Sequence, residues 1–427
     1  MLINSLLSFL ANQNLDIRQR GKEPASRFID QKVTPDVLSV IANSILSLNK
    51  ETFTSRDIWD CSEFSSSVRI YFGKGDVNLQ DFKNEYDKFI GQCINTLNFS
   101  GVISLIGKRS TSNLFKIVNK EILLFIASSD KNSYIFLLNF LKETLKQSGL
   151  WNAFENFFTS NLLTNTEYVI LKDNFDKFMK NYSNIKTSNF YETKRIFPKV
   201  INPLAVDRQA LGSRSGRLSK DIITYSELLY NRTNWRDINK PKGISRHQYR
   251  INNTEYERTR KYLIEKSKKS IKQYHTFKNP KNKLESEICD SYTTETCFHA
   301  HHIFPECDYE EISDALENII ILTAGQHYSF AHPNGNTNIV SKEYQKKCLL
   351  AKLNTILFSQ YSEIYDINRF IEVLEIGLNI TISDDISLLS SNNDIYKCLS
   401  KVIINYYDSY ANDINFKPIL SNNVQAY

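Results

Sequence analysis

Long hydrophobic runs are missing from this sequence. No stretch of eighteen or more apolar residues occurs, and the short apolar patch after Met1 has no basic region before it. A membrane-spanning helix needs about 20 mostly apolar residues, and a secretory signal begins with basic residues. Neither is supported, so we expect a cytoplasmic protein with no membrane partner.

Cysteines are few, and their spacing excludes the common frameworks. The seven cysteines are odd in number and scattered, which favours a reducing compartment over a disulfide framework. Four of them surround a histidine-rich segment without forming a Cys-x-x-Cys pair: Cys289, Cys297, Cys307 and Cys348. We therefore expect buried, reduced thiols and no structural zinc.

Glycine is also scarce, with 13 residues in the chain. The stretch Gly212 to Gly216 is too short for a nucleotide-binding loop and lacks the residues that follow one, so we interpret it as a flexible basic loop. No ATP requirement is expected. Low glycine with frequent Asn, Ile, Lys and Tyr is typical of AT-biased coding, which makes the lysine count alone weak evidence for DNA binding.

Length and composition predict a folded α+β protein, mainly helical, with two or three domains. The chain has 427 residues, of which 41% are hydrophobic and 23% charged. We expect an N-terminal recognition region over residues 1–185, a linker and basic segment over 186–284, and a C-terminal domain over 285–427.

Positive charge is concentrated in the middle segment. Residues 208–283 contain twenty Lys or Arg against six Asp or Glu, a local net charge of +14 in a chain of net +6. Aromatic residues lie between the arginines, as phosphate and base contacts require, although part of the segment could be a solvated helix face. The candidate DNA-binding residues here are Arg214, Arg217, Arg232, Arg236, Arg246 and Arg250.

The first hundred residues predict a different module. Thr34-Pro35-Asp36 is typical of a helix start, a short helix should follow Thr54, and 79–97 has helical spacing. Two strands are expected at 102–106 and 114–118, around a basic loop that carries Lys108 and Arg109. Helices followed by a basic-tipped hairpin indicate a winged-helix-like region, with DNA contact as one interpretation and a plain structural hairpin as the other.

The rest of the chain predicts helices with core aromatics. Residues 120–185 are rich in Phe, which we assign to the core, and 186–202 has weak periodicity that suggests an interdomain link. Beyond Ser341 the pattern is mostly helical through Tyr407.

Five of the seven histidines lie between Phe298 and Pro333. On an extended segment the adjacent His301 and His302 point to opposite faces, so one can hold a metal while the other addresses a water or substrate. Phosphodiester hydrolysis needs both a cation and a base near neutral pH. The run from Asn318 to Leu322 is apolar and β-branched, which predicts a buried strand, and a helix to about Ala331 could follow it. The amide of Asn318 could lock the intervening loop by bonding backbone groups.

The segment resembles an HNH nuclease of the ββα-metal class over roughly residues 285–355. The second half of that family's motif reads Asn-apolar-x-x-Leu-x-x-x-x-His, and here His327 follows Asn318 at the same distance of nine residues. The resemblance implies a catalytic set of His302, as general base, and Asn318. It implies His301 and His327 as ligands of Mg²⁺ or Mn²⁺. The two positions that often carry a zinc-binding Cys-x-x-Cys are here Thr323 and Gln326.

Three further residues are left as substrate contacts or alternative ligands: Gln326, His332 and Asn336. His332 follows His327 by five residues, which is off the same-face spacing of an α-helix.

The wider phrase through Lys352 resembles restriction endonucleases of this class. With a separate reading region, it predicts a Type IIS enzyme that cleaves double-stranded DNA and leaves 5′ phosphate, either by transient dimerisation on DNA or by successive nicks. A cognate methyltransferase is the expected genetic companion. A homing-type or non-specific nuclease, or a regulator with a structural metal site, stays open.

Overall fold

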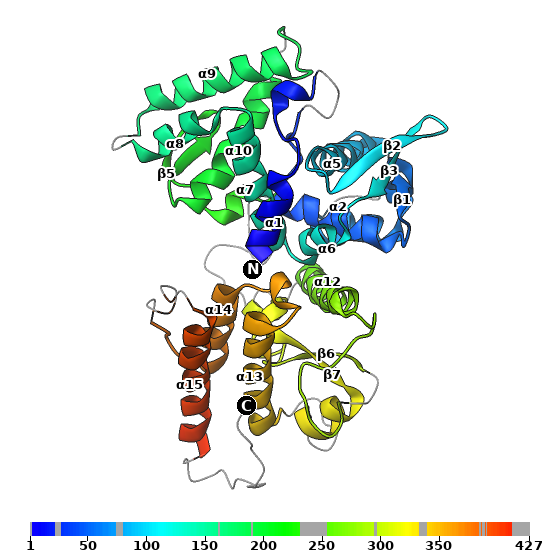
Figure 1. Cartoon of the computed structure of the whole chain (residues 1–427), viewed down its shortest axis with the longest axis vertical. Coiled ribbons are helices and arrows are strands. Elements are labelled where there is room, and N and C mark those ends of the chain that lie inside the picture. The colour runs from blue at the N-terminus through cyan, green and yellow to red at the C-terminus, as the bar shows by residue number, and fades with distance from the viewer. Residues whose placement is uncertain are drawn as a thin grey trace. The chain divides into compact units, whose positions relative to one another are not determined.

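The computed structural model describes residues 2–21, 27–73, 80–160, 163–188, 191–230, 254–293, 297–332, 340–383, 386, 389 and 391–411. These residues are mainly helical, with one three-stranded and two two-stranded sheets (Figure 1). The α+β, mainly helical class is thereby confirmed. The chain divides into two compact units, Met1–Lys266 and Ser267–Tyr427, whereas the sequence suggested divisions at 185 and 284.

The first half of unit 1 combines helices with a small antiparallel sheet. The sheet order is β1-β3-β2, so the first strand pairs with the last. Its elements are α1 (Leu2–Ala11), α2 (Pro35–Ser47), β1 (Thr52–Thr54), α3 (Ser55–Trp59), α4 (Ser62–Tyr71), α5 (Gln80–Phe99), β2 (Ile103–Arg109) and β3 (Ser112–Ile117).

Local sequence explains most of these boundaries. Thr54 starts α3 through a capping box with Asp57, and Thr34 occupies the N-cap position of α2 with Pro35 inside the helix. The expected loop at 107–113 is wrong, because both strands extend to a two-residue turn in which Ser110 has φ 56°. The sequence interpretation also missed β1 and α4.

The second half of unit 1 is a helical layer with a β-hairpin. Its elements are α6 (Lys120–Ser128), α7 (Asp130–Gln147), α8 (Trp151–Thr159), α9 (Asn165–Tyr182), α10 (Glu192–Asp207), β4 (Leu211–Arg214) and β5 (Arg217–Ile222). The expected link at 186–202 is wrong over most of its length, because α10 buries Ile196, Phe197 and Val200 in the unit. The expected loop at 212–216 is also wrong, since these residues form the paired ends and turn of the β4–β5 hairpin.

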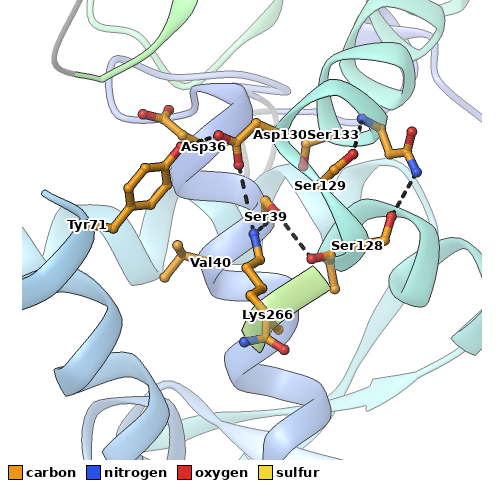
Figure 2. A network of polar contacts seen from close by, with 12 residues as sticks. Asp36, Ser39, Val40, Tyr71, Ser128, Ser129, Asp130, Ser133 and Lys266 are labelled. Carbon is orange, nitrogen blue, oxygen red and sulfur yellow. Dashed lines mark hydrogen bonds and ion pairs between the residues drawn. The ribbon is translucent and has the colours of Figure 1, made fainter. Parts of the chain in front are cut away.

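A buried polar network joins helices of unit 1 (Figure 2). Lys266 donates from Nζ to Ser39 Oγ at 2.6 Å and lies 3.8 Å from Asp130, whose carboxylate also accepts from the Tyr71 hydroxyl. Burial raises the pKa of the adjacent Asp36 to about 7, and the negative charge of Asp130 adds to the effect. Lys266 is 6% exposed, so its charge is held by these partners rather than by water.

Unit 2 packs a β-hairpin and helices around one apolar core. The division from unit 1 falls inside α12 (Thr254–Lys278), and the other elements are β6 (Cys297–His302), β7 (Ile319–Thr323), a π-helical turn (Gln326–Ala331), α13 (Lys342–Phe358), α14 (Ile367–Leu378) and α15 (Asn392–Ala411). The core includes Phe304, Ile320, Leu349 and Phe370, each inaccessible to solvent. Every residue of β7 is buried, as its apolar, β-branched sequence predicts.

Among the described residues, no helix is both long and apolar enough to cross a membrane.

Candidate metal centre

The β6–β7 hairpin carries the adjacent histidines. In this antiparallel pair His301 lies opposite Ile320 and His302 opposite Ile319. Successive strand residues point to opposite faces, so the two imidazoles are directed into different surroundings. This is the separation that the sequence predicts.

On one face, His301 meets two histidines from the turn after β7. A nitrogen of His301, one of His327 and one of His332 all lie within 4.8 Å of one another. The His301 ring centroid is 5.1 Å from that of His327 and 4.9 Å from that of His332. His301 and His332 are buried and His327 is half-buried, so the cluster is a compact pocket of three imidazoles.

A π-helical turn explains why His332 joins the cluster. The His332 N–H donates to the His327 carbonyl at 3.1 Å, an i→i+5 hydrogen bond. In an α-helix a spacing of five places side chains on different faces, but in a π-turn it places them about one turn apart. The alternative ligand of the sequence analysis therefore lies with the two principal candidates.

The electrostatics favour neutral imidazoles in this pocket. Burial lowers the pKa of His301 well below its usual value, and the neighbouring His327 and His332 lower it further. Burial, with the charges of His332 and His299, lowers the pKa of His327 to about 4. Metal ligation needs the deprotonated ring, so His301 and His327 are in the form that binds an ion at neutral pH.

The donor set indicates which ions fit. The cluster that the described residues form contains three imidazoles and no carboxylate. Imidazole suits Zn²⁺, Ni²⁺, Cu²⁺ and Fe²⁺, whereas Mg²⁺ and Mn²⁺ prefer oxygen ligands. Three histidines with an open position are also a known catalytic zinc arrangement. The residues therefore fit a divalent transition ion better than Mg²⁺.

On the other face, His302 is oriented by the loop that joins the strands. Its Nε2 lies 2.9 Å from the Ser313 carbonyl oxygen, and its Nδ1 lies 3.7 Å from Glu306. A carbonyl only accepts hydrogen bonds, so Nε2 carries the proton and, in the neutral ring, Nδ1 carries the lone pair. His302 is thereby held in the tautomer in which Nδ1 can act as a base.

Asn318 closes the same loop at the entrance to β7. Its amide oxygen accepts from the Phe304 N–H at 2.9 Å, and its amide nitrogen donates to the carbonyls of Phe304 at 3.0 Å and Ile312 at 3.2 Å. The side chain is inaccessible to solvent. Asn318 therefore ties together two parts of the loop that follows His302, and it is not one of the clustered side chains.

Gln326, a candidate for a substrate or ligand role, is buried in a hydrogen-bond network of its own. Its side chain is inaccessible and accepts from the Thr323 N–H at 3.0 Å and from Ser286 Oγ at 2.5 Å. It also donates to the Ile288 carbonyl at 3.0 Å and to Asp290 at 2.9 Å. Both the oxygen and the nitrogen of the amide are hydrogen-bonded, so Gln326 connects the chain before β6 to the start of the π-helical turn.

The described candidate DNA contacts have different surroundings. Lys108 and Arg217 are exposed, whereas Arg109 pairs with Asp57 at 3.3 Å. Arg214 is bound to Glu227 at 2.6 Å and to Asp221 at 3.0 Å, so much of its charge is already compensated. The candidates Arg232, Arg236, Arg246, Arg250 and Asn336 lie outside the described residues.

Sequence reasoning missed two residues beside the pocket. The His299 ring stacks on that of His327, with centroids 4.7 Å apart and planes 8° from parallel. The positive charge of Lys268 is one of the smaller causes that lower the pKa of both His301 and His327, after burial. His299 could have been found by strand alternation, since residues 299 and 301 share a face, but Lys268 is distant in the sequence and gives no such signal.

No family model, no curated protein and no solved structure matches this chain.

Proposed function

We propose that this protein is a metal-dependent endonuclease of the ββα-metal type that hydrolyses phosphodiester bonds in double-stranded DNA. The observation that carries the proposal is the pairing of two adjacent imidazoles with different surroundings. His301 joins His327 and His332 within 4.8 Å, while His302 is held separately through the Ser313 carbonyl. An ion site beside an oriented base is the minimum equipment for hydrolysing a phosphodiester.

His301, His327 and His332 would hold the ion. When bound, a divalent ion stabilises negative charge on the phosphoryl and leaving oxygens. The His302 Nδ1 would take the proton of the attacking water, and the Glu306 carboxylate, 3.7 Å from that nitrogen, would stabilise the resulting imidazolium. Departure of the 3′ oxygen leaves a 5′ phosphate. Asn318 keeps His302 in place through the loop backbone.

The finer proposal is a Type II restriction endonuclease, of the Type IIS kind that cuts beside its recognition site. It is supported by the order of helices and strands in the first half of unit 1, whose β2–β3 hairpin ends in Lys108 and Arg109 and suits a winged-helix-like reading region. A single nuclease site cuts one strand at a time, so a double-strand break requires transient dimerisation on DNA or successive nicks. No ATP is required, and a cognate methyltransferase would protect the host DNA.

The test is cleavage of unmethylated phage DNA in Mg²⁺, Mn²⁺, Ni²⁺ or Zn²⁺, with EDTA as control, followed by sequencing of the fragment ends. His302→Ala should lower the cleavage rate by about 10²–10⁴-fold and keep metal affinity, because it removes a base and not a ligand. His327→Ala should lose both properties. Phe298→Ala, which removes an exposed side chain of the same strand, is the control and should keep both.

The fragment ends decide the type of nuclease. Ends at a fixed distance from one short asymmetric sequence support the Type IIS proposal, and ends within a palindrome argue against cleavage at a distance. Smeared ends indicate a non-specific nuclease. Absence of cleavage with every ion would contradict the nuclease proposal.

A DNA-binding regulator with a structural metal is the second candidate. The donor set is compatible with it, because three imidazoles without a carboxylate suit ions that proteins use structurally as well as catalytically. For that candidate, EDTA should lower the thermal stability of the protein, and no ion should produce cleavage. A nuclease should regain cleavage when the ion is returned.

A further inference from the structure

Unit 1 contains a cavity that the proposed nuclease site does not use. Its volume is about 470 Å³, within the range of roughly 300–1,000 Å³ that is typical of small-ligand pockets. The walls come from the chain before α2, from α10, from the turn of the β4–β5 hairpin and from the segment that ends at Tyr230. All of these lie within one unit, so the cavity is a property of that unit alone.

The described lining of this cavity is strongly cationic. It contains Lys32, Lys194, Arg195, Lys199 and Arg214, against the single carboxylate of Glu227. Charges of one sign in a concave site with low-dielectric walls reinforce one another and attract counter-ions. Small anions or phosphate esters are the ligands that such a cavity selects.

Glu227 does not cancel this field. Its carboxylate accepts from Arg214 Nε at 2.6 Å and Arg214 Nη2 at 2.8 Å, and these hydrogen bonds, as the main cause, lower the pKa of Glu227 to about 2. The charge of Lys32 is likewise shared, since it lies 2.9 Å from Glu85 and 4.8 Å from the Tyr230 ring centroid. The other three cations of the lining, Lys194, Arg195 and Lys199, belong to α10.

Three cations lie on α10 within two turns. Arg195 and Lys199 are four residues apart and share a face, and Lys194 is adjacent to Arg195. Lys194 and Arg195 are exposed, whereas Lys199 is half-buried, and its charge is one of the influences that reach the buried Asp36. Two exposed cations and a half-buried one in the same lining can contact more than one oxygen of the same phosphate.

The remaining wall is suited to an organic group. It includes the apolar side chains of Val33, Leu137 and Leu228 and the aromatic ring of Tyr230. Apolar and aromatic surface beside a phosphate-binding group fits a sugar and base better than an inorganic anion.

We propose that this cavity binds the phosphate of a nucleotide, which is either free or part of a nucleic acid. The site is separate from the imidazole cluster, which lies wholly in unit 2. Binding at the cavity therefore needs no ion held by the imidazole cluster, and it does not depend on whether the protein cleaves DNA.

The test uses the full chain in EDTA, which prevents metal-dependent phosphate binding and cleavage. Adenosine 5′-monophosphate and inorganic phosphate are titrated by calorimetry, and a labelled DNA duplex by fluorescence anisotropy. Lys194→Ala/Arg195→Ala removes two exposed cations of the cavity. Lys177→Ala/Lys220→Ala is the matched control, because it removes two exposed cations of unit 1 that do not line the cavity.

We expect the cavity variant to bind the phosphate-bearing probe at least about 100-fold more weakly, at about tenfold for each lost charge-assisted contact. The control should bind almost as wild type. Loss of adenosine monophosphate binding identifies a free nucleotide, whereas loss confined to the duplex identifies a nucleic-acid phosphate. Equal weakening in both variants would reveal only non-specific charge attraction and would overturn the proposal, as would wild-type protein that binds none of the probes.

Discussion

Glu317 makes the stability of unit 2 depend on pH, and replacing it with Gln should remove that dependence. Burial raises the pKa of Glu317 from its ordinary value of 4.5 to about 7, although the Asp366 N–H donates to its carboxylate at 2.9 Å. A pKa raised in the folded state means that the native protein holds the proton more tightly. The associated stability is present below about pH 4.5 and is lost as pH rises through about 7.

The magnitude follows from the shift. About 2.5 pKa units at 1.36 kcal/mol each correspond to about 3 kcal/mol of stability lost between pH 4.5 and pH 8. No screening discount applies, because the side chain of Glu317 is 4% exposed. Glu317→Gln keeps an oxygen for the Asp366 N–H and carries no charge, so it should be more stable than wild type by about 3 kcal/mol at pH 8 and nearly equal at pH 4.5.

Urea unfolding followed by hydrogen exchange of peptides from β7 and α13 measures this difference in unit 2. Comparison of variant with wild type at each pH cancels every titration that the two proteins share. Glu343→Gln, which removes an exposed carboxylate from the same unit, is the matched control. A flat profile for Glu317→Gln, or one that favours wild type at high pH, would refute the reasoning.

Two other substitutions test the packing behind the hairpin. Lys352→Met breaks a fully buried ion pair, in which the Lys352 Nζ lies 2.7 Å from the Glu287 carboxylate. The variant should lower the free energy of unfolding by about 3–5 kcal/mol in a urea titration, because Glu287 is left as a buried charge without this partner. A loss below about 1 kcal/mol would contradict a buried ion pair that is shielded from water. Gly377→Ala places a Cβ against the ring of Phe304 and should cost about 1–3 kcal/mol in thermal unfolding, whereas Gly91→Ala, which meets nothing within 4 Å, should be neutral or stabilising. Equal effects of the two alanines would show that the ring can move aside.

Elements with a strong local signal were predictable from sequence. The helix α5, the β2–β3 hairpin and the strand β7 each combine a clear apolar period with an uninterrupted run of suitable residues. The small strand β1 has three residues, and its pairing with β3 joins positions about sixty residues apart. A pairing of that range leaves no local trace, because tertiary packing selects it.

The helix α10 was missed for a different reason. The link at 186–202 was inferred from weak periodicity. In the structure, the buried residues Ile196, Val200 and Leu204 repeat every four positions, which is a helical period that begins late in that range and continues past its end. The helix also contains Pro198 and Pro203, each of which removes a helical hydrogen bond, so its buried apolar face outweighs two proline penalties.

In the candidate site, residue spacing predicted the strands but not the geometry of the turn that follows β7. The spacing of His301, His302, Asn318 and His327 predicted the hairpin and the direction of its side chains, because strand alternation depends only on residue order. It could not place His332, because a five-residue spacing joins His327 only if the turn closes from i to i+5 instead of i to i+4. That choice depends on contacts at both ends: Gln326 is bonded to the chain before β6, and the Ala331 carbonyl accepts from Ser341 at 3.1 Å. Residues outside the histidine motif therefore decide whether the cluster has two nearby imidazoles or three, and a motif match alone underestimates the number of imidazoles in the cluster.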